Sequence, residues 1–161
     1  MSNPVVQVAM PLYFDRVDPA TPEALVLLDQ LSIALEVVTG DSGRASFDAA
    51  DVRGARALFL LARDHDGKPV GCGAFRPISS TVAEVKRMYA VQGGSGIGSR
   101  ILAQLEAEAK AMHYQEIWLE TRLVNQVAVR FYEQRGYVRI ANYGKYIGNA
   151  KAVCFGKRLP D

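Results

Sequence analysis

The stretch from Thr81 to Met112 constrains the fold more than any other part of this 161-residue chain. A β-rich run, TVAEVKRMY, ends at Tyr89 and leads into a segment in which glycine recurs up to Gly98. The apolar residues that follow recur at helical spacing: Ile101, Leu102, Leu105, Ala109 and Met112. The stretch therefore predicts a strand, a glycine turn and an amphipathic helix in succession.

The glycine turn, with glycines at 93, 94, 96 and 98, is a candidate phosphate site. Glycines let the backbone approach a ligand closely, and the N-terminus of the following helix favours negative charge. The same glycines also suit a turn that binds nothing. The context of strand, turn and helix favours the anion site, but it does not name the ligand.

The rest of the chain predicts further strands and helices. Strands are expected at 5–9 and 12–14 (one strand interrupted by Pro11), 57–62, 69–75, 115–121, 137–141 and 151–158. Helices are expected from Thr21 to near Gly40 and over 126–135. This order predicts an α/β protein with a mixed sheet of about seven strands, mostly antiparallel with a central parallel pair, and helices on both faces.

The composition, with 49% hydrophobic and 22% charged residues, is typical of one globular domain over residues 1–161. A net charge of +2 without blocks of like charge gives no indication of nucleic acid as a partner. No apolar run is long enough to span a membrane and no signal peptide is evident, so we expect a cytoplasmic protein. Cys72 and Cys154 are expected to be buried free thiols. His65 stands in a turn without ligand spacing, so no metal site is expected.

Four segments, taken together, resemble the GNAT superfamily of N-acetyltransferases. They are AEVKRMY (83–89), GSGIG (94–98), IWLET (117–121) and NQVAVRFYEQRGY (125–137). The resemblance extends from about Phe59 to Phe155. It implies that strands 81–89 and 115–121 splay apart, so that the pantetheine arm of acetyl-CoA pairs with exposed backbone like an extra strand.

The resemblance also implies that acetyl-CoA is the cosubstrate and that the turn binds its pyrophosphate. The implied binding residues are Met88, Tyr89, Ala90, Gly93, Gly94, Ser95, Gly96, Ile97, Gly98, Ser99 and Asn125. The turn departs from the family pattern at Gly93, where Arg or Gln is usual, and Gln92 lies one residue too early. We therefore expect weaker cofactor binding than the family turn gives.

Two residues are candidates for the chemistry of acetyl transfer to an amine. Tyr132 is the candidate acid for the leaving thiolate, since a phenol with a pKa of about 10 can protonate a thiolate whose conjugate acid lies near about 8.5. At its helical spacing beside Phe131 it also suits a core aromatic. Glu84 resembles the strand glutamate that serves as base in histone-modifying members, and it equally suits a pair with Lys86, Arg87 or another cation.

Asn125 suits a helix cap, a pantetheine contact or both. The resemblance implies a backbone N–H near Tyr89 as oxyanion donor.

The expected activity is direct transfer of an acetyl group to an amine without an acyl-enzyme, because no Cys or Ser with a paired base is evident. The acceptor is a small-molecule or peptide amine, and a homodimer is left open. A non-catalytic acyl-CoA sensor of the same fold is the first alternative. A dinucleotide enzyme is the second, although Gly94-Ser-Gly96-Ile-Gly98-Ser99 lacks the last glycine of G-x-G-x-x-G.

Overall fold

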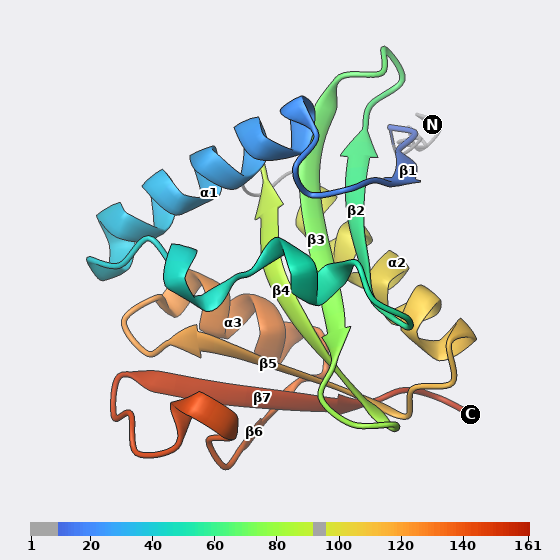
Figure 1. The fold of residues 1–161 in the computed structure, drawn as a ribbon. Helices are drawn as coiled ribbons and strands as arrows, with labels where there is room; N and C mark the ends of the chain where they lie inside the picture. The colour runs from blue at the N-terminus through green and yellow to red at the C-terminus, as the bar shows by residue number, and fades with distance from the viewer. Residues whose placement is uncertain (1–9, 92–95) are drawn as a thin grey trace, which may run out of the picture.

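The computed structural model describes residues 10–91 and 96–161. Seven strands form one sheet in the order β1-β2-β3-β4-β5-β7-β6 (Figure 1). The strands are β1 (Tyr13–Arg16), β2 (Leu58–Arg63), β3 (Pro69–Pro77), β4 (Val82–Ala90), β5 (Glu116–Arg122), β6 (Val138–Ile140) and β7 (Ala152–Arg158). The α-helices are α1 (Pro22–Thr39), α2 (Ile97–Ala111) and α3 (Gln126–Gln134). Short 3-10 turns are η1 (Arg44–Ser46), η2 (Ala49–Val52) and η3 (Gly144–Tyr146).

The pairing of the strands confirms the predicted mixed sheet. Within the described residues β4 and β5 are the one parallel pair, and the other neighbours pair antiparallel. A doubly wound dinucleotide fold is excluded, because β1 to β4 form a continuous antiparallel run instead of repeating βαβ units. The first strand differs from its prediction: it runs from Tyr13 to Arg16, paired with β2, and residues 5–9 lie outside the described part of the chain.

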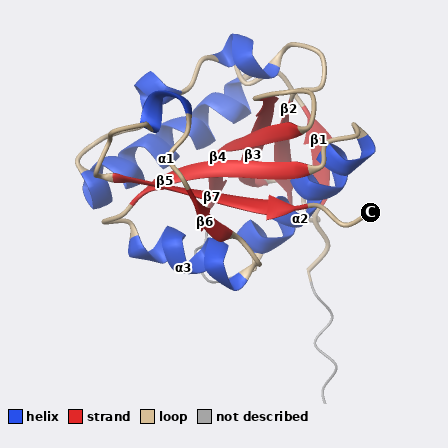
Figure 2. Cartoon of the chain, turned by 90° about the horizontal axis from the view of Figure 1, so that it is seen from below, coloured by secondary structure: helices blue, strands red, loops and turns tan. Residues whose placement is uncertain are grey.

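Helices cover both faces of the sheet, as predicted (Figure 2). Alternation along β2 divides its apolar residues between two cores. Phe59 and Leu61 face α1, where Leu27 and Leu28 pack against them. Leu58 and Leu60 face the opposite core, to which α2 and α3 contribute Leu102, Leu105 and Val129. The site described below lies where β4 and β5 separate between these two layers.

A close approach between β3 and β4 depends on glycine at position 71. A Cβ there would stand 2.6 Å from the carbonyl oxygen of Tyr89 and 2.5 Å from Cδ1 of Ile101. We therefore expect Gly71→Ala to destabilise the protein by about 2 kcal/mol, within the range for overpacked cores. Urea unfolding would measure this as a lower midpoint. Gly54→Ala is the matched control, because apart from its chain neighbours no described residue has an atom within 4 Å of its Cβ position. Equal midpoints for the two variants would contradict the conclusion that the packing of β3 against β4 requires glycine at position 71.

Two further observations concern the described part of the chain. No helix in it is both long enough and apolar enough to cross a membrane. Cys72 and Cys154 are free and buried, as the sequence predicted.

Candidate active site

A cleft opens where β4 and β5 stop pairing. Their parallel ladder joins Val82 to Glu116, Ala83 to Ile117 and Glu84 to Trp118, and no further pair follows within the described residues. Both strands continue, β4 to Ala90 and β5 to Arg122. The predicted splaying of these strands is therefore confirmed. A cavity of about 160 Å³ lies between them, bounded also by α1 and α3. The edge of β4 from 85 to 90 is thus open to an extended ligand.

A β-bulge in β4 lies beside this cleft. Cys72 pairs with Tyr89 but Ala74 pairs with Lys86, so β4 carries one extra residue there. Arg87 takes up the irregularity with a φ of 55°. Its guanidinium is turned toward α1, where it donates to Ser32 Oγ at 2.5 Å and to the Leu28 carbonyl at 3.2 Å. The bulge therefore changes the direction of the β4 backbone groups that border the cleft.

The structure describes part of the predicted cofactor-binding residues. Met88, Tyr89 and Ala90 end β4, and Met88 lines the cleft. Gly93, Gly94 and Ser95 lie outside the described residues.

Gly96, with a φ of 81°, is the N-cap of α2, and Ile97, Gly98 and Ser99 form the first helical turn. A Cβ on Gly98 would lie 3.5 Å from Phe131 and 4.0 Å from Cβ of Ala90. The N-terminus of α2, whose first N–H groups have no acceptor within the helix, thus lies close to the end of β4. Phosphate binding by the turn stays a prediction.

Tyr132 lies on α3 between the core and the cleft. Its ring packs edge-on against Phe131 and Tyr137, with centroid distances of 5.1 and 5.7 Å. The side chain also lines the cavity. Burial raises the pKa of its phenol well above the ordinary value, so the hydroxyl is protonated at neutral pH. Tyr132 is therefore a core aromatic that also borders the cleft. The raised pKa makes its phenol a weaker acid than an exposed tyrosine, and its role as the acid stays a prediction.

Asn125 begins α3 at the same wall. Its Oδ1 accepts a hydrogen bond from the backbone N–H of Ala128 at 3.2 Å, so the predicted helix cap is confirmed. Asn125 also lines the cleft. Its contact with a pantetheine amide stays a prediction.

Glu84 lines the cleft as a buried and fully hydrogen-bonded carboxylate. It is 1% exposed, and Oε1 accepts from Nε of Arg76 at 2.8 Å. Oε2 accepts from the hydroxyl of Tyr143 at 2.5 Å, and Lys86 Nζ lies 3.6 Å from Oε1. Lys86 was a predicted partner and lies near the carboxylate, but Arg76 on β3 lies closer. Through its hydrogen bond with Tyr143, Glu84 connects the segment 142–151 to the sheet. The role of Glu84 as the base stays a prediction.

Glu120 is a second carboxylate of the cleft, and the sequence did not single it out as a catalytic residue. Its side chain is 11% exposed, and Oε1 is buried without a hydrogen-bond partner among the described residues. Nη1 of Arg122 lies 3.6 Å away. Burial raises the pKa of Glu120, and Arg122 and Lys86 oppose that rise. The sequence did contain a signal for Glu120. Alternation along β5 places the charged residues 120 and 122 on the face opposite Ile117 and Leu119.

No metal centre competes with this interpretation in residues 10–91 and 96–161. There, no group of three or more His, Cys, Asp or Glu side chains is placed to hold a metal ion.

The candidate site therefore comprises the cleft between two diverging parallel strands, the N-terminus of α2 at the end of β4, and Tyr132 in the cleft wall. Residues 28–137 match the model of the acetyltransferase (GNAT) family. The chain belongs to this family.

One relative is similar in sequence, and two solved structures share the fold. The IAA acetyltransferase of Azospirillum brasilense is 34% identical over 91 residues, which cover 55% of this chain and 59% of that protein. The chain thus spans about three fifths of the length of this relative. A GNAT acetyltransferase of Staphylococcus aureus Mu50 has a TM-score of 0.73 at 14% identity, covering 93% of this chain and all (100%) of the other. A GNAT acetyltransferase of Elizabethkingia anophelis with acetyl-CoA bound has a TM-score of 0.69 at 14% identity, covering 92% and 98%.

Proposed function

We propose that this chain transfers an acetyl group from acetyl-CoA directly to a primary amine. The observation that carries the proposal is the cleft between β4 and β5, with Tyr132 in its wall and the edge of β4 unpaired. An extended chain of amide groups fits an edge that offers backbone donors and acceptors. The residues that would hold the cofactor are those at the end of β4, the glycine turn and Asn125. Acetyl-CoA would supply the activated acetyl group as a thioester.

Direct transfer is supported by the state of the cysteines. Burial raises the pKa of the Cys72 thiol to about 12, so it is not a thiolate at neutral pH. Cys154 is also buried, and neither thiol is among the residues that line the cleft. In our proposal the amine nitrogen attacks the thioester carbonyl, a backbone N–H near Tyr89 binds the developing oxyanion, and the carbon–sulfur bond breaks. Tyr132 donates its phenolic proton to the departing thiolate.

The amine must lose a proton, and two carboxylates of the cleft are candidates to receive it. Both oxygens of Glu84 already accept hydrogen bonds, one from a cation and one from a phenol. Oε1 of Glu120 has no such partner among the described residues, and the pKa of Glu120 is raised. A raised pKa makes a carboxylate a stronger base, and an oxygen that accepts no hydrogen bond is available to take the proton of the amine. These contacts favour Glu120, while Glu84 remains the second candidate.

The pH dependence of turnover distinguishes the two carboxylates. The base acts in its ionised form, so kcat/KM should fall as pH falls through its pKa, which for Glu120 lies above the ordinary 4.5. Glu120→Gln should lower kcat/KM about 100-fold at neutral pH and remove this acidic limb. Glu84→Gln should keep the limb. If Glu84→Gln removes the limb and Glu120→Gln leaves it, the assignment is reversed.

The cytoplasmic location, the absence of nucleic-acid and membrane partners, and the oligomeric state remain predictions. Calorimetric titration with acetyl-CoA, followed by a thiol-release assay over a panel of amines, tests the proposed activity. Binding without thiol release across the panel would identify the alternative, an acyl-CoA sensor.

A further inference from the structure

A groove of about 1060 Å³ continues from the cleft toward the surface. Thr39, Asp41 and Arg122 line both spaces, so the groove and the cleft meet. Three segments form its walls: the end of α1, the turn between β5 and α3, and residues 147–151 before β7. This volume is at the upper end of the range of about 300 to 1,000 Å³ that is common for ligand pockets. A small amine such as ethylamine would leave most of the groove unfilled. The groove is therefore large enough for the body of an acceptor.

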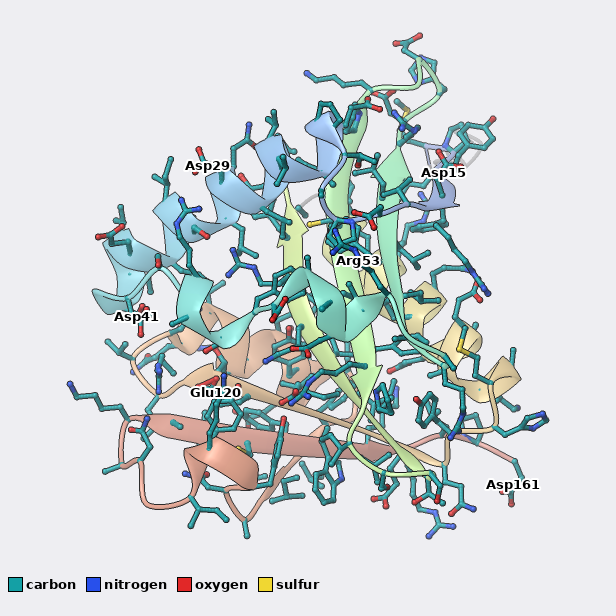
Figure 3. The ribbon with its side chains drawn as sticks, in the orientation of Figure 1. Asp15, Asp29, Asp41, Arg53, Glu120 and Asp161 are labelled. Atoms are coloured by element: carbon teal, nitrogen blue, oxygen red, sulfur yellow. The ribbon has the colours of Figure 1, made fainter. Side chains whose placement is uncertain are left out.

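Where the groove meets the cleft, two carboxylates flank one guanidinium: Asp41 lines both spaces, and Glu120 lines the cleft. Figure 3 labels Asp41, in the segment after α1, and Glu120, on β5. The guanidinium of Arg122 lies 3.7 Å from Oδ2 of Asp41 and 3.6 Å from Oε1 of Glu120. Neither distance is that of a hydrogen bond, so an ammonium group can compete for the carboxylates.

Beyond this junction the groove is lined by three exposed apolar side chains and by no further acid among the described residues. Leu123, Val124 and Ile147 line it and are 41%, 62% and 71% exposed. Its charged lining residues are Asp41, Arg122 and Lys151, one acid against two bases. A polyamine or an aminoglycoside would bring several positive charges to walls that carry a net positive charge, and it would gain little from the three apolar side chains.

We infer that the acceptor is a monoamine with an apolar body, whose ammonium group reaches Glu120 and whose body lies on Leu123, Val124 and Ile147. This inference rests on the proposed function and names its substrate class. The required chemistry, one primary ammonium group joined to an apolar group, occurs in free arylalkylamines and at the amino-terminus of a peptide that begins with an apolar residue.

An acceptor panel tests the inference on the full-length protein saturated with acetyl-CoA. The probes are phenethylamine, a tetrapeptide with amino-terminal Phe, ethylamine and spermidine. We expect kcat/KM for phenethylamine or the tetrapeptide to exceed that for ethylamine and spermidine by about tenfold or more, because an apolar group of this size contributes such a factor in a complementary site. The better of the two apolar probes identifies the source. Higher kcat/KM for spermidine would overturn the inference while leaving the acetyltransferase activity established.

Two exposed positions provide a matched pair of variants. Ile147→Ser removes an apolar wall, and Val138→Ser makes a similar change on β6, where Val138 is 64% exposed and is not among the groove-lining residues. We expect Ile147→Ser to raise KM for phenethylamine about five- to tenfold, with KM for ethylamine and the Kd for acetyl-CoA unchanged. Val138→Ser should change none of them. An unchanged KM for phenethylamine in Ile147→Ser would overturn the inference.

Direct binding separates this inference from the proposed function. If no probe is acetylated, the proposed function fails. Calorimetry with phenethylamine still measures whether the groove binds an apolar monoamine. Binding that weakens in Ile147→Ser and persists in Val138→Ser would support an apolar monoamine site. Absence of phenethylamine binding to the wild-type protein would overturn it.

Discussion

Replacing Tyr132 by Phe is expected to lower kcat about 100-fold and to leave the Kd for acetyl-CoA nearly unchanged. Phe keeps the ring, which packs against Phe131, Tyr137 and Phe155. The variant loses only the hydroxyl, and with it the proposed proton donor. Steady-state kinetics with a confirmed acceptor and calorimetry with acetyl-CoA measure the two quantities.

Tyr137→Phe is the control for loss of a buried hydroxyl. Tyr137 donates to Oε2 of Glu106 at 2.9 Å and is not among the residues that line the cleft. It should lower stability by about 1 kcal/mol without a comparable fall in kcat. Normal turnover in Tyr132→Phe would leave Tyr132 with its packing role alone.

Replacing Gly96 by Glu is expected to weaken acetyl-CoA binding by about 100-fold or more. Gly96 caps the N-terminus of α2, and apart from its chain neighbours no described residue has an atom within 4 Å of the position that a Cβ would take. A carboxylate therefore has room there, next to the predicted pyrophosphate site. A like charge at about 4 Å costs roughly 1 to 4 kcal/mol, depending on exposure.

Gly96→Gln isolates the effect of this charge. Both variants place a side chain at a φ of 81°, so they share the backbone strain, and they have nearly the same size. Calorimetry should show much weaker binding for Gly96→Glu than for Gly96→Gln. Equal affinities in the two folded variants would contradict phosphate binding at this helix N-terminus.

Much of the fold could be predicted from local sequence. The run that ends at Tyr89 is β-rich, and the apolar residues from Ile101 to Ala109 have helical spacing, so the structure has β4 and α2 where the sequence predicted them. The splaying of β4 and β5 was predicted only through the family resemblance, because the end of a ladder between distant strands has no local signature.

The contacts of the candidate site could not be predicted in the same way. Glu84 meets Arg76 from β3 and Tyr143 from the segment before β7, and both contacts depend on how distant segments pack. The bulge at Arg87 depends on the pairing of β4 with β3. Glu120 differs from an exposed strand glutamate in its burial and in an Oε1 that accepts no hydrogen bond from the described residues. These properties arise from tertiary packing, which residue patterns along one strand do not contain.

The most direct test of the central claim is a thiol-release assay on the wild-type protein with acetyl-CoA and the amine panel, followed by mass spectrometry of the amine. We predict that thiol release depends on an amine, that the amine gains the mass of one acetyl group, and that the protein mass does not change. An amine-independent gain of an acetyl group on the protein, or no transfer to any amine despite bound acetyl-CoA, would contradict direct acetyl transfer in the cleft between β4 and β5.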